Sequence, residues 1–142
     1  MFKNILLTID LGHNASWEKA LPQAVELIQA SGGTLHIMGI VHDIGSAMVA
    51  SYLPADFEEQ ALHAMKTALN AFADAHVPAG IDTKTHVGHG HVAEVIVKKA
   101  KKQDIDLIVM ASHPPDELRT LLVGSYASKV VRNSKVAVLV VR

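Results

Sequence analysis

Two hydrophobic patterns alternate along the chain: short apolar runs, and longer segments in which apolar residues recur at helical spacing. The runs are too short for helices and are apolar at consecutive positions, as expected of strands covered on both faces of a sheet. They predict strands at 5–9, 34–41, 107–111 and 136–141. Residues 81–87 instead alternate apolar and polar residues, which is typical of an edge strand with one solvent-facing side.

The segments between these strands have the period of amphipathic helices. They predict helices that begin near residues 14, 54, 92 and 125 and end near residues 31, 77, 102 and 132. Pro22 falls inside the first, so that helix either bends there or begins later than its apolar pattern. Residues 42–53 predict a loop with apolar anchors at Met48, Val49 and Tyr52.

This order of elements, β-α-β-α-β-α-β-α-β, indicates an α/β fold with a mainly parallel sheet, helices on both faces and right-handed crossovers. A length of 142 residues fits a single domain over 1–142. Hydrophobic residues make up 49% of the chain and charged residues 19%, so a substantial core can form.

Composition excludes several classes of function. A net charge of -1 argues against nucleic acid as a partner, and the lysines at 98–102 lack the interleaved aromatic residues of an RNA platform, so we interpret them as a solvated helix face. The absence of cysteine excludes a disulfide framework, a thiol nucleophile and a cysteine zinc site. No apolar run approaches the ~20 residues of a membrane span, and the first residues do not resemble a signal peptide, so we expect a cytoplasmic protein with no membrane partner.

The candidate chemistry lies at the carboxyl ends of the strands, where open parallel sheets bind ligands. These ends fall at Thr8 to Asp10, 40–43, 87–88 and 110–113. After the last of them, a long excursion returns at Gly124-Ser125, where free amides at a helix start favour a phosphate. The alternative is that this pair only caps the helix.

Two other constellations are weaker candidates. His86, His89 and His91 could hold a metal, but no Asp, Glu or Cys completes the set, so solvated loop histidines are the better interpretation. Ser125, His113 and Asp116 are the residue types of a hydrolase triad without the G-x-S-x-G turn, and we interpret the grouping as accidental. We therefore predict no catalytic residue.

The whole chain resembles the universal stress proteins of the UspA type. The resemblance rests on residues 5–10, Gly88 before a helix, residues 106–113, Gly124-Ser125 and residues 138–141. It implies a doubly wound five-stranded sheet of order 3-2-1-4-5, of the adenine nucleotide alpha hydrolase-like type. It also implies a homodimer through the C-terminal strand, whose apolar edge favours pairing.

Family members that bind ATP carry a motif of glycine, two residues, glycine, nine residues, then glycine and serine or threonine. This chain keeps the spacing but has Ala111 and Pro114 at the first two glycine positions. Alanine adds a methyl group where a glycine allows close approach, and proline removes an N–H group that could meet a phosphate oxygen.

By the same resemblance, the cofactors would be ATP and Mg²⁺. Asp10, with Thr8 before it, would face the ribose or the metal, and the main chain of Ile40 or Val41 would meet the adenine edge. For Asp10, a cap on the turn after the first strand is an equally good interpretation. The remaining predicted site residues would support the sugar or hold the phosphates: Met110, Ala111, Gly124, Ser125, Tyr126 and Ala127.

The predicted function is a stress-responsive adenine-nucleotide-binding protein, in which binding orders residues 112–123 and changes the surface offered to an unknown protein partner. Two alternatives remain open at this point. One is a dimer without nucleotide that acts only through protein contacts. The other is a slow nucleotide hydrolase in which Asp10 holds the metal.

Overall fold

The fold is organised around a parallel sheet with the strand order β3-β2-β1-β4-β5, as predicted. The computed structural model describes residues 1–41, 47–112 and 120–142; at residues 47, 50 and 120–125 it describes only the main chain. The strands are β1 (Asn4–Thr8), β2 (Thr34–Val41), β3 (Asp82–His89), β4 (Leu107–Ala111) and β5 (Ala137–Val141). The segment predicted as an edge strand, 81–87, corresponds to β3 at one edge of the sheet.

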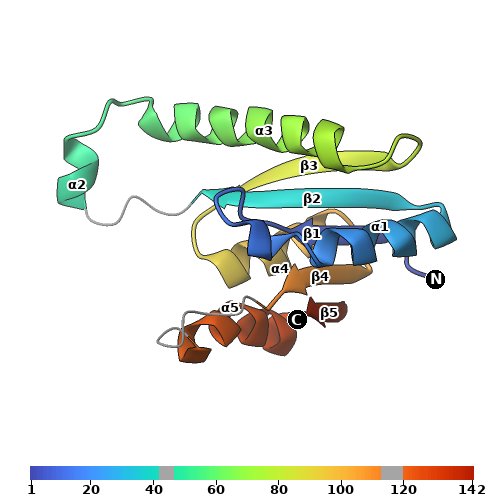
Figure 1. Cartoon of the computed structure of the whole chain (residues 1–142). Coiled ribbons are helices and arrows are strands. Elements are labelled where there is room, and N and C mark those ends of the chain that lie inside the picture. The colour runs from blue at the N-terminus through green and yellow to red at the C-terminus, as the bar shows by residue number, and fades with distance from the viewer. Residues whose placement is uncertain (42–46, 113–119) are drawn as a thin grey trace.

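Helices cover both faces of this sheet (Figure 1). They are α1 (Ala20–Ser31), α2 (Ala47–Ser51), α3 (Phe57–His76), α4 (Val92–Lys102) and α5 (Thr120–Asn133), with a short 3-10 turn, η1 (Asn14–Ser16). Side chains of α1 and α3 belong to one hydrophobic core, and those of α4 and α5 belong to the other. The order of elements and the two-sided covering confirm the predicted α/β class.

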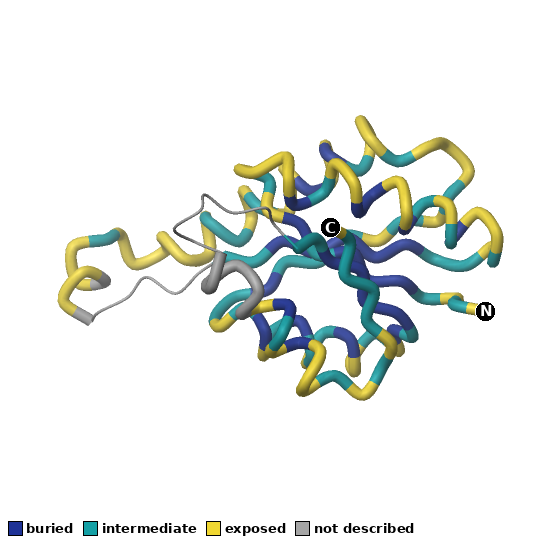
Figure 2. The backbone as a smooth tube through the Cα atoms, turned by 60° about the horizontal axis from the view of Figure 1, so that its bottom comes forward, coloured by how far each residue is buried: buried dark blue, intermediate teal, exposed yellow. Residues whose placement is uncertain are grey.

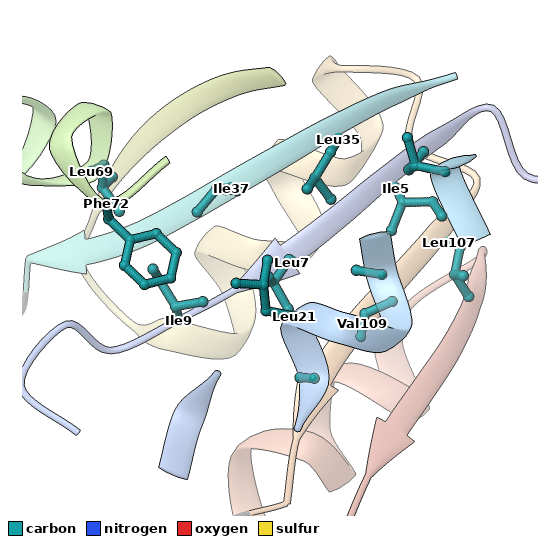
Figure 3. Packing of buried hydrophobic residues seen from close by; sticks show 13 residues of the cluster. Ile5, Leu7, Ile9, Leu21, Leu35, Ile37, Leu69, Phe72, Leu107 and Val109 are labelled. Carbon is teal, nitrogen blue, oxygen red and sulfur yellow. The ribbon is translucent and has the colours of Figure 1, made fainter. Parts of the chain in front are cut away.

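Alternation along the strands assigns residues to the two cores. In β1, Ile5 and Leu7 pack under α1 and α3, whereas Leu6 between them packs under α4 and α5. Figure 3 shows the first core, where Phe72 of α3 lies near Ile9 at the end of β1. Figure 2 shows the same arrangement as a buried centre within exposed helix surfaces.

The first helix resolves the conflict raised by Pro22. It begins at Ala20 rather than near residue 14, so the proline lies in the first turn, where its missing N–H has no partner within the helix. The helix ends where Gly32 adopts a left-handed conformation, with φ of 70°, and donates its N–H to the carbonyl of Ile28.

The predicted loop 42–53 contains a helix that the sequence reasoning did not anticipate. Helix α2 spans Ala47–Ser51 and stands apart from the sheet in Figure 1. Met48 and Tyr52 are 73% and 84% exposed, so neither residue is buried as an anchor.

Helix α5 begins at Thr120, and the predicted start at Ser125 is therefore wrong. Leucines at positions 121 and 122 are good helix formers, and an interior glycine costs a helix only about 1 kcal/mol, so Gly124 does not set the boundary. The amides of residues 124–127 lie within the helix, where each N–H is bonded to the carbonyl four residues earlier. The expectation of free amides at this position is therefore wrong.

Candidate nucleotide site at the carboxyl edge of the sheet

The order of the strands reverses between β1 and β4, and a doubly wound sheet binds ligands at such a point. Leu7 pairs with Val109, so Thr8 and Met110 are the next residues along the two strands. Met110 is only 5% exposed and its side chain lies in the core under α4 and α5. Only its main chain is therefore left to meet a ligand at this edge.

Asp10 follows β1 and holds the turn after it. Its Oδ1 atom accepts a hydrogen bond from the Gly12 amide at 2.9 Å, and its Oδ2 atom lies 2.9 Å from Nδ1 of His13. The Asp10 side chain nevertheless remains 55% exposed, and that of His13 is 70% exposed. The turn-capping interpretation of Asp10 is thus confirmed, and the exposed carboxylate still faces solvent at the carboxyl edge.

The hydroxyl of Ser16 holds the main chain of Asp10 through hydrogen bonds. Its hydroxyl accepts a hydrogen bond from the Asp10 amide at 2.8 Å and lies within donor distance of the carbonyls of Asp10 and His13, at 2.8 and 2.7 Å. Ser16 is only 3% exposed, so these bonds are shielded from water. The spacing of Ser16 from Asp10 in the sequence gave no sign of this contact.

The end of β2 offers main-chain groups beside Asp10. The register that pairs Thr8 with Met38 places Ile40 opposite Asp10, which has already left the strand. The Ile9 amide bonds to the Met38 carbonyl, so Ile40, two residues further, directs its N–H and C=O to the same side. Among the described residues, Ile40 has no main-chain hydrogen bond to the segment after β1.

Val41, the next residue, points its main chain the other way, because its carbonyl accepts the amide of Gly90 at 3.2 Å. Of the two residues predicted to meet an adenine edge, Ile40 is therefore the one whose main chain faces the switch point. An N–H donor beside a C=O acceptor is the arrangement that can pair with the edge of a purine.

Residues predicted to hold phosphates lie on α5. Tyr126 is 47% exposed, whereas Ala127 is only 8% exposed and packs into the core. Ser112, where the predicted excursion begins, donates its amide to the carbonyl of Val141 at 2.8 Å. His113, Pro114 and Asp116 lie outside the described residues.

The histidine cluster does not form a metal site in the described part of the chain, where no group of three or more ligand side chains is brought together. His86 and His89 lie in β3, so the interpretation as solvated loop histidines is wrong for both. His86 contacts a second ring, that of His36, and Nδ1 of His89 lies 3.3 Å from Oε1 of Glu58. His91 is exposed just before α4.

A family model described as the universal stress protein family matches residues 1–142 of the chain. The chain belongs to the universal stress protein family. This universal stress protein is 32% identical over 146 residues to universal stress protein G of Salmonella typhimurium, and the match covers 100% of both chains.

Solved structures of universal stress proteins share its fold. Universal stress protein UspA from Lactobacillus plantarum matches with a TM-score of 0.75 and 24% identity, covering 99% of this chain and 97% of that one. A universal stress protein crystallised in complex with cAMP matches with a TM-score of 0.66 and 24% identity, over 99% and 97% of the two chains. Within the described residues, no helix is both long and apolar enough to cross a membrane.

Proposed function

We propose that this universal stress protein binds ATP or a related adenine nucleotide at the carboxyl edge of its sheet and acts in the stress response through protein contacts. The observation that carries the proposal is the placement of the exposed Asp10 carboxylate opposite Ile40, whose main-chain groups face the same switch point. A relative of the same fold was crystallised with cAMP, which shares the adenine group.

The predicted residues at the strand ends have places in the proposed complex. The main chain of Ile40, with Val41 beside it, meets the adenine edge, and Thr8, Met110 and Ala111 lie under the sugar. Asp10 contacts the ribose, or holds Mg²⁺ when a triphosphate is bound, since an exposed carboxylate is a ligand that Mg²⁺ prefers. The magnesium ion would neutralise phosphate charge.

The phosphates would lie near the first turn of α5, because the helix dipole favours negative charge there. The amides of the four predicted contacts, Gly124, Ser125, Tyr126 and Ala127, are bonded within α5, and Ala127 is buried. The exposed Tyr126 is therefore the contact that we retain among them. Ordering of residues 112–123 around the phosphates would change the surface offered to a partner, which makes the nucleotide a signal rather than a substrate.

Titration calorimetry with Mg-ATP, AMP and GTP tests this proposal. We expect heat with the adenine nucleotides and little with GTP, and we expect Asp10→Asn to weaken ATP binding because it removes the charge but retains the turn-capping oxygen. Glu26→Gln is the matched control, since Glu26 is an exposed acid on α1 and its loss should leave affinity unchanged. Absence of heat with every nucleotide would refute the proposal.

A second candidate, a dimer that works without nucleotide, is favoured by one observation. Helix α5 continues through residues 124–127, so the amides there already have partners within the helix. Ala111 also favours this candidate, because its methyl group lies where the family glycine allows a nucleotide to approach closely. Protein purified under native conditions and free of nucleotide, together with a flat calorimetric titration, would support this candidate. Phosphate release abolished by Asp10→Ala would instead support a slow hydrolase.

We infer that the protein forms a homodimer in the cytoplasm through β5. The two edges of the sheet differ: at β3, Lys66 donates to the carbonyl of Thr85, and Asn70 bonds to the hydroxyl of the same residue. The Lys66 side chain therefore occupies a main-chain carbonyl at the β3 edge, which disfavours pairing there. At β5, the residues from Val138 to Val141 are apolar and only partly buried in the single chain, which suits pairing with a second copy.

A further inference from the structure

Two histidine rings meet across the junction between the inner strand β2 and the edge strand β3. His36 pairs with Lys84 in the register and Met38 pairs with His86, so His36 and His86 are diagonal neighbours on the face covered by α4 and α5. Nδ1 of His36 lies 2.7 Å from Nε2 of His86, and the rings are nearly parallel, with centroids 5.0 Å apart.

His36 is only 2% exposed, and its second ring nitrogen, Nε2, is buried without a hydrogen-bond partner. The pair has four ring nitrogens. Two neutral rings carry one proton each. One of these protons lies in the hydrogen bond between the rings and the other can be on Nδ1 of His86, so Nε2 of His36 can remain without a proton. In this arrangement Nδ1 of His36 is the donor. If Nε2 of His86 were the donor instead, the proton of His36 would be on its buried Nε2, and buried N–H groups without a partner are rarer than buried acceptors without one.

When the pair takes up one more proton, Nε2 of His36 can no longer remain unprotonated. Three protons must then occupy four nitrogens, and one of them still lies between the rings. The other two must therefore be on Nδ1 of His86 and on Nε2 of His36. Any singly charged pair that keeps its hydrogen bond thus places an N–H at a buried position with no acceptor, which is strongly unfavourable.

The charges around the pair oppose protonation as well. Lys84 and Asp82 of β3, Lys66 of α3 and Lys99 of α4 act on one or both rings, and only Asp82 is negative. Burial lowers the pKa of His36, and burial followed by the neighbouring His36 and the lysines lowers the pKa of His86 to about 4. Burial also lowers the pKa of Lys99, and the nearby Lys102 and Lys66 lower it further, so positive charges oppose one another beside the pair.

We propose that the His36–His86 pair is an acid-sensitive latch that holds β3 against β2 while both rings are neutral and releases this edge strand when the pair takes up a proton. An acceptor for Nε2 of His36 becomes available only if the rings separate and water enters. Because β3 is an edge strand, it can move away from β2 without breaking any other strand pairing.

Hydrogen exchange followed by NMR tests the latch directly. The Thr85 carbonyl faces away from β2, because it accepts a hydrogen bond from Lys66 of α3. Main-chain direction alternates along a strand, so the amides of His86 and Gly88 face β2. After correction for intrinsic rates, we expect the protection of these two amides to fall by about tenfold between pH 7 and pH 5. The amide of Leu6 in the central strand β1, which exchanges only when the sheet unfolds, should stay better protected than these two amides at both pH values.

Two variants sharpen the test. His36→Leu fills the buried position with an apolar side chain and removes the unpartnered Nε2, so the loss of β3 protection at pH 5 should become smaller. The burial of His86 is then the main remaining cause of acid sensitivity. His63→Gln removes an exposed histidine on α3 and should behave as the original protein. Equal acid sensitivity in His36→Leu and in the original protein would overturn the proposal.

A direct titration covers the case in which His36→Leu fails to fold. We expect the ring nitrogens of His86 in the unaltered protein to keep their neutral chemical shifts down to pH 5, because the pKa of His86 is lowered to about 4. Protonation of His86 near pH 6.5 with β3 fully protected would refute the latch.

Discussion

A Cβ atom on residue 33 would lie 2.0 Å from the carbonyl oxygen of Lys3. Gly33 therefore lets β2 begin directly beside β1, where the amide of Thr34 donates to the same carbonyl at 2.7 Å. The atoms in the way belong to the main chain of a strand, so they cannot move aside as the end of a flexible side chain could.

From this contact we predict that Gly33→Ala destabilises the protein by about 2–4 kcal/mol, in the range of overpacking and backbone displacement. Urea unfolding measures the change. Gly12→Ala is the control, because a Cβ there meets only Oδ1 of Asp10, at an ordinary 3.4 Å. Equal stabilities of the two variants would show that β1 and β2 can separate at little cost.

The buried hydroxyl of Ser16 gives a second prediction. Ser16→Ala leaves the amide of Asp10 without its partner at a shielded position and should cost about 1–3 kcal/mol. Ser128→Ala is the control, since the Ser128 hydroxyl accepts only a long 3.4 Å bond from Arg132 on the helix surface. If the variants unfold at the same urea concentration, water replaces the Ser16 hydroxyl without loss.

Stability should also depend on pH in a defined direction. The unfolded chain protonates His86 near pH 6.5, whereas the folded protein does so only near pH 4, because burial and the adjacent His36 lower this pKa. The folded state thus binds fewer protons in this window, so the contribution is fully present above pH 6.5 and is lost as the pH falls towards 4.

We expect the free energy of unfolding to fall by roughly 1–2 kcal/mol between pH 7 and pH 5, after allowance for the partial exposure of His86. Urea titrations at the two pH values measure this difference. The His36→Leu variant should show a smaller one, and a free energy that rises on acidification would contradict the assignment.

The proposed dimer makes a prediction about single amides of β5. The carbonyl of Val141 faces β4, where it accepts the amide of Ser112, so the main chain of Val140 faces outward. Val140→Pro removes one outward N–H and leaves the pairing with β4 intact, as edge strands allow. We expect a dimer in the original protein and a monomer in this variant by analytical ultracentrifugation.

Val140→Thr controls for the altered side chain, because it keeps the amide and should remain dimeric. Circular dichroism checks that both variants are folded. A dimer that persists in Val140→Pro would place the interface elsewhere on the surface.

The periodicity of hydrophobic residues predicted most of the strands and helices. Consecutive apolar residues in β1 and β4 marked strands covered on both sides, and alternation marked β3 as an edge strand, because side-chain pattern follows burial directly. The position of Asp10 at the carboxyl edge of the sheet was also predictable, because this residue directly follows the first predicted strand. The start of α5 was misjudged because Gly124 was given more weight than the helix-forming residues before it.

The sequence by itself determined the α/β class, the strand order implied by its resemblance and the family to which the chain belongs. Only the tertiary structure decided that Ser16 holds Asp10, that Ile40 faces the switch point, and that His36 meets His86. The physical reason is register. These contacts join residues on different segments, and their partners are set by how one strand is aligned against the next, which no local pattern of hydrophobicity records.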